Sequence, residues 1–199
     1  MPSAKPPKVL LNLQRTSILL VDADMMAQSI VVQMLIGFGA RAVERCDNLV
    51  EARRELAKNP FDLIITDPAG FGQDGYDLIS WMRRELPAPN RHAPVLVVTG
   101  HTEHSRIGQL RDSGANFVVS RPLSATVLLE RILWMSREKR PYVETGHYVG
   151  PDRRWRDQAL PEGTLGGRQK DRDVAARIAA GGDMSQEEID MVMNAAASS

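Results

Sequence analysis

Apolar residues along positions 16–139 follow two alternating patterns. Short apolar runs predict strands, and apolar residues spaced three and four apart predict helices. The predicted strands are residues 18–21, 41–45, 61–66, 94–98 and 116–119. The predicted helices are residues 25–38, 48–58, 76–86, 104–113 and 124–139, with Asp47 and Ser124 as N-caps of the second and the last. The pattern therefore predicts strand–helix units in strict alternation.

Such alternation implies an α/β fold, in which a parallel sheet carries helices on both faces. The functional site of a sheet of this kind lies at the carboxyl ends of its strands. Those ends carry four polar residues, Asp22, Asp67, Thr99 and Arg121. We therefore expect these side chains to meet in one crevice.

The four residues together suit phosphoryl chemistry. Mg²⁺ binds through one or two carboxylates and phosphate oxygens. The Asp67 carboxylate can attack phosphorus, and Arg121 can pair with the phosphate that results. Each residue alone has a commoner explanation, as a helix cap, a strand former or a solvated charge. Their occurrence at successive strand ends favours the functional interpretation.

Composition narrows the classes of function. The 25 Lys and Arg residues balance the 25 Asp and Glu residues, so net charge favours neither nucleic acid nor an anionic membrane. No apolar run reaches the ~20 residues that span a bilayer. The start of the chain lacks the apolar stretch of a signal peptide. The lone Cys46 is more simply a buried inert residue than a reactive thiol. These features predict a soluble cytoplasmic protein.

Residues 16–139 resemble the receiver domain of two-component response regulators. The matching segments are ILLVD ending at Asp22, DLIITD ending at Asp67, Gly75, PVLVVTG ending at Gly100, SGAN at 113–116, and Arg121-Pro122. The resemblance implies a flavodoxin-like, doubly wound sheet of five parallel strands in the order 2-1-3-4-5.

The resemblance also implies a role for each site residue. In that family the aspartate matched by Asp67 is phosphorylated by a histidine kinase or a phosphotransfer protein. The implied Mg²⁺ ligands are Asp22, Asp67 and the backbone carbonyl of Ala69. Thr99 would be the switch hydroxyl, and Arg121 would hold the phosphate.

Several positions depart from the family pattern. Ala23 stands where a second acidic residue usually supplies a metal ligand, which weakens the expected Mg²⁺ site, and Asp24 is a doubtful substitute one place further on. Arg121 replaces a lysine, and Phe71 replaces a proline. The usual switch aromatic maps to Val118, with Phe117 just before it. A receiver that signals without phosphate therefore stays open as an alternative.

The chain from residue 140 is rich in Gly and Pro, which predicts an irregular extension. Residues 148–154 resemble a tail found after some alphaproteobacterial receiver domains. We favour packing or protein contact for this tail. The alternative is that Arg153, Arg154 and Arg156 bind a nucleotide or nucleic acid.

Residues 183–194 predict a short amphipathic helix with a capping box of Ser185 and Glu188. Its apolar stripe, the expected partner-binding surface, consists of Met184, Ile189, Val192 and Met193. Residues 185–190 resemble the N-terminal peptide of the flagellar motor-switch protein, which binds a phosphorylated chemotaxis regulator. Two uses are open: docking on its own receiver, within the chain or in a homodimer, or capture of another receiver.

We predict four segments: an N-terminal arm at 1–15, a receiver domain at 16–139, the extension at 140–182 and the terminal helix at 183–199. The predicted function is that of a response regulator phosphorylated on Asp67. We expect it to signal through protein contacts, without a DNA-binding output domain, a membrane partner or turnover of a small molecule. The two alternatives are a phosphate-independent adaptor and a receiver with a nucleotide-binding or nucleic-acid-binding tail.

Overall fold

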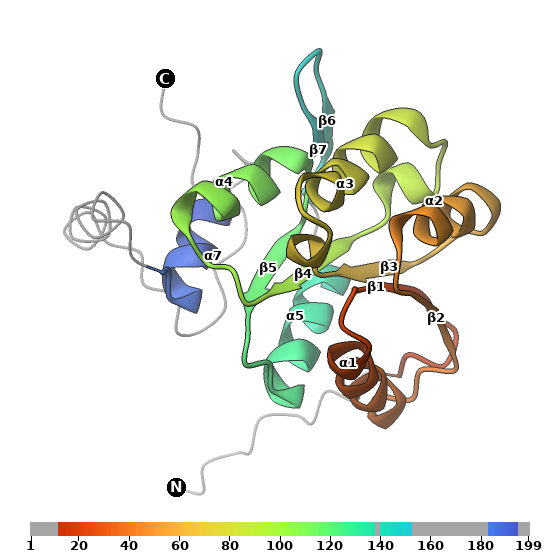
Figure 1. The fold of residues 1–199 in the computed structure, drawn as a ribbon. Coiled ribbons are helices and arrows are strands. Elements are labelled where there is room, and N and C mark those ends of the chain that lie inside the picture. The colour runs from red at the N-terminus through yellow and green to blue at the C-terminus, as the bar shows by residue number, and fades with distance from the viewer. Residues whose placement is uncertain (1–11, 138–139, 153–182, 195–199) are drawn as a thin grey trace, which may run out of the picture.

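The structure is a computed structural model that describes residues 12–137, 140–152 and 183–194. Its centre is a parallel five-stranded sheet with the order β2-β1-β3-β4-β5 (Figure 1). The strands are β1 Ser17–Val21, β2 Ala42–Cys46, β3 Leu63–Thr66, β4 Val95–Thr99 and β5 Phe117–Ser120. The predicted doubly wound fold and its strand order are confirmed.

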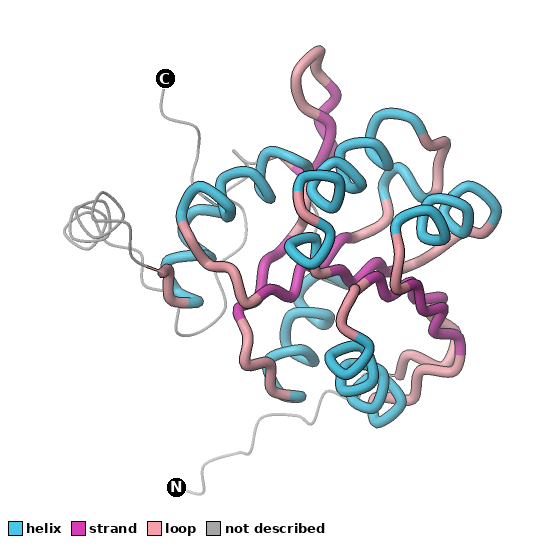
Figure 2. Tube along the Cα trace, in the orientation of Figure 1, coloured by secondary structure: helices cyan, strands magenta, loops and turns pink. Residues whose placement is uncertain are grey.

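Helices cover both faces of this sheet, with α1 and α5 on one face and α2, α3 and α4 on the other (Figure 2). The bounds are α1 Met25–Gly37, α2 Leu49–Lys58, α3 Gln73–Glu85, α4 His104–Ser113 and α5 Ala125–Arg137, with short 3-10 turns at η1 Pro68–Phe71 and η2 Asn90–His92. No helix in the described part of the chain is long and apolar enough to cross a membrane.

Two helix starts differ from the prediction. Asn48, not Asp47, caps α2, because its side-chain oxygen accepts a hydrogen bond from the Glu51 amide at 2.9 Å. Helix α3 begins at Gln73, three residues before the predicted start, so that Gly75 lies inside its first turn.

The sheet divides the core into two layers because successive side chains of a strand point to opposite faces. Leu19 and Val21 pack with α2, α3 and α4, whereas Ile18 and Leu20 pack with α1 and α5. Cys46 is fully buried in the first layer, and burial raises the pKa of its thiol to about 12. This environment supports the inert interpretation of the cysteine.

Residues 142–151 form a β-hairpin where the sequence predicted no regular element. Strand β6 Tyr142–Glu144 pairs antiparallel with β7 Val149–Pro151. Gly146 lies in the connecting turn. Pro151 has no amide hydrogen, and it is tolerated at the end of a strand that pairs with β6 alone. The glycine and proline positions therefore bound the hairpin instead of excluding it. The rest of the expected irregular extension, at 153–182, lies outside the described residues.

Helix α7 Gln186–Asn194 lies beside α4 and β5 (Figure 1). Its predicted capping box is confirmed: the Ser185 amide donates to the Glu188 carboxylate at 2.6 Å, and the Glu188 amide donates to the Ser185 hydroxyl at 3.3 Å. The last residues of the chain, 195–199, fall outside the described part.

Candidate functional site

The four residues predicted at the strand ends lie together in the structure. The Arg121 Nη2 atom is 2.5 Å from Asp22 Oδ2 and 3.5 Å from Asp67 Oδ2. The Thr99 side chain makes a hydrogen bond with the Asp67 carboxylate. Asp22, Asp67 and Thr99 are at least 93% buried, with exposed fractions of 3%, 7% and 1%. The site is therefore a preformed cluster of two carboxylates, one cation and one hydroxyl.

Asp67 is held by the turn that follows β3. Its Oδ1 atom accepts a hydrogen bond from the Ala69 amide at 3.1 Å, which caps the η1 turn. Burial raises the pKa of the Asp67 carboxyl above its ordinary value, against the opposing effects of Arg121, of Thr99 and of the Ala69 amide. Desolvation is the largest cause because the carboxylate has lost most of its contact with water.

Arg121 and Thr99 are connected through their main chains as well. The Arg121 amide donates to the Thr99 carbonyl at 2.8 Å, which joins the ends of β5 and β4. The Thr99 hydroxyl also accepts a hydrogen bond from the His101 amide at 3.1 Å. A chemical change at the Asp67 carboxylate can therefore reach the β4–α4 loop directly through the Thr99 side chain.

Gln28 is a site residue that the sequence analysis did not find. Its Nε2 atom donates to the Asp22 carbonyl at 2.7 Å and to the Cys46 carbonyl at 2.8 Å, and its Oε1 atom accepts from Arg45 at 3.0 Å. The side chain is 2% exposed. It fastens the ends of β1 and β2 and so positions Asp22. The available sign was a glutamine at helical spacing from the buried Val31 and Leu35.

The donor set around the crevice fits Mg²⁺, which uses few carboxylates and keeps several waters. The candidate ligands are Asp22, Asp67 and the Ala69 carbonyl. That carbonyl also accepts from the Gly72 amide at 3.2 Å. The described residues contain no group of three or more His, Cys, Asp or Glu side chains that could hold a metal ion. A metal ion held by the two carboxylates and the Ala69 carbonyl would therefore complete its coordination with water and phosphate oxygens.

Neither Ala23 nor Asp24 supplies the second acidic metal ligand that is usual in the family. The Asp24 carboxylate caps α1 and accepts from the Met26 and Ala27 amides at 2.8 and 3.1 Å. The Ala23 side chain packs closely against Gly70. Asp24 therefore has a structural role at the helix start, and Ala23 adds no charge.

The aromatic side chain at the start of β5 points away from the α4 face. Phe117 is buried beside Trp134 of α5, with ring centroids 4.3 Å apart in an edge-on arrangement. Val118 points to the opposite layer, with Ile107 of α4 in the same cluster. Val118 thus occupies the position that matches the family's switch aromatic, and the neighbouring aromatic ring lies on the α5 face.

The apolar stripe of α7 packs against the chain's own receiver domain. Met184, Ile189 and Met193 are buried, and Val192 is partly buried. The polar part of this contact was not predicted from the sequence. The Asp190 carboxylate pairs with Arg131 of α5 at 2.5 Å, and Gln186 bonds to the main chain of β5. Gln186 and Asp190 are four residues apart on one helical face, which was the available pattern.

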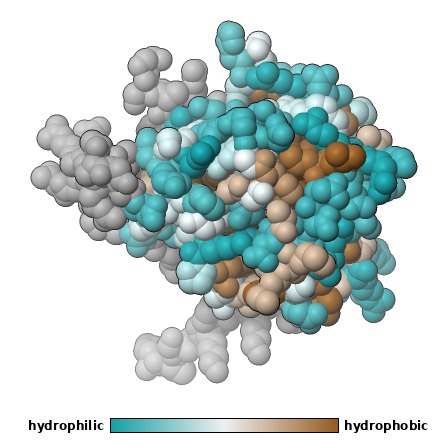
Figure 3. Space-filling view, in the orientation of Figure 1, coloured by the Kyte–Doolittle hydropathy of each residue, from teal (hydrophilic) through white to brown (hydrophobic). Residues whose placement is uncertain are grey.

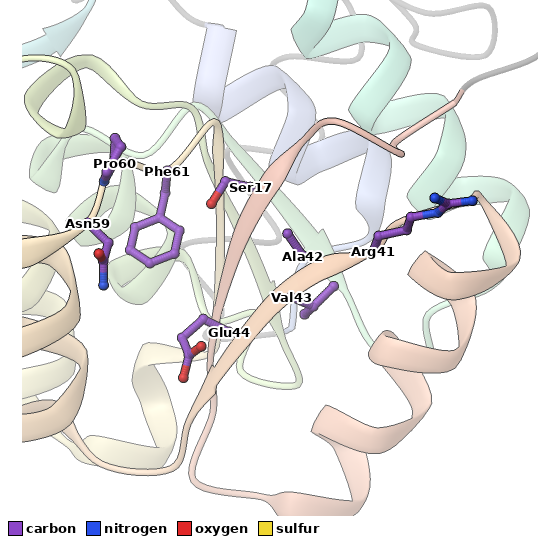
Figure 4. Close-up of a pocket in the computed structure, with 8 residues that line it drawn as sticks. All are labelled: Ser17, Arg41, Ala42, Val43, Glu44, Asn59, Pro60 and Phe61. Carbon is purple, nitrogen blue, oxygen red and sulfur yellow. The ribbon is translucent and has the colours of Figure 1, made fainter.

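A surface hollow of about 580 Å³ lies at the other end of the sheet (Figure 4). Its lining residues are Ser17, Arg41, Ala42, Val43, Glu44, Asn59, Pro60 and Phe61. They come from the start of β1, from β2 and from the segment before β3. The hollow is therefore separate from the crevice at the carboxyl ends of the strands.

Most of the chain is similar to proteins of a known family. Residues 18–133 match the family described as response regulator receiver domain. The chemotaxis protein CheY of Pseudomonas aeruginosa is 30% identical over 115 residues, which cover 58% of this chain and 91% of that protein. The chemotaxis protein CheY-3 of Vibrio cholerae is 29% identical over 115 residues, covering 58% and 87%.

Solved structures agree with this match. A putative response regulator from Chloroflexus aurantiacus superimposes with a TM-score of 0.56 at 26% identity, over 62% of this chain and 98% of that chain. The chemotaxis response regulator CheY4 of Vibrio cholerae gives a TM-score of 0.54 at 23% identity, over 60% and 97%. The second similarity supports the fold alone.

Proposed function

Since residues 18–133 make this chain a member of the response regulator receiver domain family, we propose that it is a phosphorylatable receiver whose acceptor is Asp67. The observation that carries the proposal is the contact of the buried Asp67 carboxylate with both Arg121 and Thr99. One cation and one hydroxyl beside a nucleophilic carboxylate match the charge and the hydrogen-bonding capacity of a transferred phosphoryl group.

The proposed reaction is the transfer of one phosphoryl group. An Asp67 oxygen attacks phosphorus, the bond from phosphorus to the donor's nitrogen or oxygen breaks, and an acyl phosphate forms on Asp67. Mg²⁺ held by Asp22, Asp67 and the Ala69 carbonyl would neutralise charge on the phosphoryl oxygens. Arg121 would exchange its carboxylate partners for the new phosphate, which carries nearly two negative charges.

The proposed donor is a histidine kinase or a phosphotransfer protein. Figure 3 shows apolar side chains gathered over α1 and near α2 on an otherwise largely polar face. Met25 and Met26, which follow Asp22 closely in the chain, are 64% and 75% exposed. Helix α1 has no charged residue. Exposed apolar side chains of this kind are typical of a protein-binding surface, and these begin the helix that follows Asp22.

The experiment is the intact mass of the protein after incubation with acetyl phosphate, with and without Mg²⁺. We expect one phosphoryl adduct that requires Mg²⁺, and none in Asp67→Asn. The matched control is Asp62→Asn, which changes a carboxylate at the opposite end of the same β-strand segment. No adduct from either acetyl phosphate or phosphoramidate would contradict phosphorylation and favour the phosphate-independent adaptor.

The titration of Asp67 in the metal-free protein tests the environment of its carboxyl. Burial raises the pKa of this carboxyl above its ordinary value of 3.8. We therefore expect the Asp67 carboxyl carbon signal, followed by NMR without Mg²⁺, to report protonation with a midpoint above 3.8 as the solution is acidified. Thr99→Val removes a hydrogen bond that lowers this pKa, so its midpoint should move further upward. A midpoint at or below 3.8 for the natural sequence would contradict this.

We propose output through protein contacts at the surface formed by α4, β5 and α5. In the structure α7 occupies part of that surface with Met184, Ile189, Val192 and Met193. This observation favours docking of the terminal helix within the chain over capture of another receiver. The proposed nucleotide-binding or nucleic-acid-binding role of Arg153, Arg154 and Arg156 concerns residues outside the described part of the chain.

A further inference from the structure

Helix α7 supplies a side-chain amide to the open edge of the sheet. Strand β5 pairs with β4 on one side only. On its other side the Gln186 Nε2 atom donates to the Val118 carbonyl at 2.8 Å, and Gln186 Oε1 accepts from the Ser120 amide at 2.7 Å. The Gln186 amide thus pairs with the edge groups as the peptide of a neighbouring strand would.

A second connection links the start of α7 to the β4–α4 loop. The Met184 amide donates to the Thr102 carbonyl at 2.9 Å, and Asp183 forms an antiparallel bridge with Glu103. Both Met184 and Thr102 are buried. The segment before α7 therefore holds the loop that begins at Thr99, the residue that bonds to Asp67.

A polar pair and an apolar side chain fasten the helix in this position. Asp190 pairs with Arg131 at 2.5 Å and also accepts from Gln186 Nε2 at 2.9 Å. Ile189 is fully buried in the same core cluster as Val118. The orientation of the Gln186 amide is thus set by Asp190 on its own helix and by β5.

The contacts of Gln186 and of Met184 reach the end of β5 and the β4–α4 loop, which adjoin the site. Ser120 directly precedes Arg121, whose guanidinium contacts both Asp22 and Asp67. We infer that Gln186 is a positioning residue: docked α7 holds the end of β5 so that Arg121 stays on the two carboxylates, and it thereby opposes entry of a metal ion and of a phosphoryl group. This inference rests on the proposed function of Asp67.

Linkage requires the reverse effect to be equally large. If docked α7 favours the arrangement in which Arg121 pairs with Asp22 and Asp67, then a phosphate that draws Arg121 away weakens the docking of α7. Phosphorylation would thus expose Ile189 and the β5 edge to a partner. Couplings of this kind in proteins typically change an affinity by about 5- to 150-fold.

The test compares Gln186→Ala with Glu187→Ala in the full chain. Glu187 is the exposed neighbour on the same helix, which makes it the matched control. Hydrogen exchange, read by mass spectrometry, measures whether α7 is docked. Titration calorimetry with Mg²⁺ measures whether the carboxylates are free to bind the ion. The rate of incorporation from acetyl phosphate measures phosphorylation. We expect Gln186→Ala to speed exchange in α7 and at Ser120, to tighten Mg²⁺ binding and to raise the phosphorylation rate, the last two by at least about fivefold.

Ile189→Asp is the second variant, because it releases α7 without touching the Gln186 contacts, and it should act in the same direction. Faster exchange in α7 with unchanged Mg²⁺ affinity in both variants would overturn the inference. So would exchange in Gln186→Ala that equals the Glu187→Ala control. Failure of phosphorylation in every variant would contradict the proposed function, whereas the exchange and Mg²⁺ measurements would still decide whether α7 controls the carboxylates.

Discussion

Replacing Arg83 with methionine is expected to lower the free energy of unfolding by about 3–5 kcal/mol. Arg83 lies on α3, and its side chain has no exposed surface. Its guanidinium donates to the Gly114 carbonyl at 3.0 and 3.1 Å and to the Arg91 and Ala93 carbonyls at 2.8 Å each. It also donates to the Asn116 side chain at 3.0 Å.

The expected loss of stability comes from the buried hydrogen-bond acceptors that the substitution leaves without a donor. Burial lowers the pKa of the Arg83 guanidinium, so the folded state carries a cost of desolvation that its hydrogen bonds offset. Methionine fills much of the volume but donates nothing. Several buried carbonyls would lose their donor, and an unsatisfied buried acceptor costs about 1–3 kcal/mol.

Arg84→Met is the matched control for this prediction. Arg84 is the next residue on α3, is exposed, and donates to the His147 carbonyl at 3.2 Å. We expect a change within about 0.5 kcal/mol for it. Urea unfolding followed by circular dichroism measures both variants. Equal midpoints for the two variants would show that the buried contacts of Arg83 contribute little.

Replacing Gly75 with alanine is expected to destabilise the fold by at least about 3 kcal/mol and to disturb phosphorylation as well. A Cβ atom built on Gly75 would lie 2.1 Å from the Pro68 carbonyl oxygen and 2.8 Å from its carbon. Both atoms belong to the backbone and cannot rotate away. Pro68 directly follows Asp67, so relief of the clash must move the turn that holds the phosphate acceptor.

Gly108→Ala separates this effect from the general consequence of removing a glycine. Gly108 lies inside α4, and a Cβ there meets no atom within 4 Å. Alanine should stabilise that helix by about 0.5–1 kcal/mol. Thermal unfolding and the rate of acetyl phosphate incorporation, measured on both variants, check the prediction. A Gly75→Ala protein that is as stable as the natural one would contradict the close packing of α3 on the turn at Pro68.

The hairpin at 142–151 shows a limit of local sequence patterns. Its glycines and proline predicted an irregular segment, but Gly150 is needed for packing: a Cβ there would lie 2.5 Å from the Tyr148 hydroxyl and 2.9 Å from the Gly114 Cα atom. That hydroxyl donates to the Pro151 carbonyl at 2.8 Å. Contacts with the folded domain, such as the salt bridge of Arg91 with Glu144 at 3.4 Å, support the hairpin. A pattern of residue types contains no information about such partners.

Arg83 shows the same limit in the core. Residues Arg83 and Arg84 are identical in type and adjacent in a predicted helix, yet one is fully buried and the other is exposed. Helical spacing places Arg83 with Ile79 on the inner face, but an arginine there would ordinarily be assigned to the surface. The carbonyls that satisfy it come from η2, eight residues further on, and from the segment before β5, 31 residues further on.

The sequence by itself determined the parallel sheet and the meeting of Asp22, Asp67, Thr99 and Arg121, whereas the strand order was implied by the resemblance to receiver domains. Apolar periodicity decides which segments are strands, and parallel strands bring their carboxyl ends to one edge whatever the details of packing. Tertiary structure alone decided that Gln28 positions Asp22 and that Gln186 pairs with β5. These roles depend on side-chain amides that reach main-chain groups of distant elements, and only the packed arrangement brings the two within hydrogen-bonding distance.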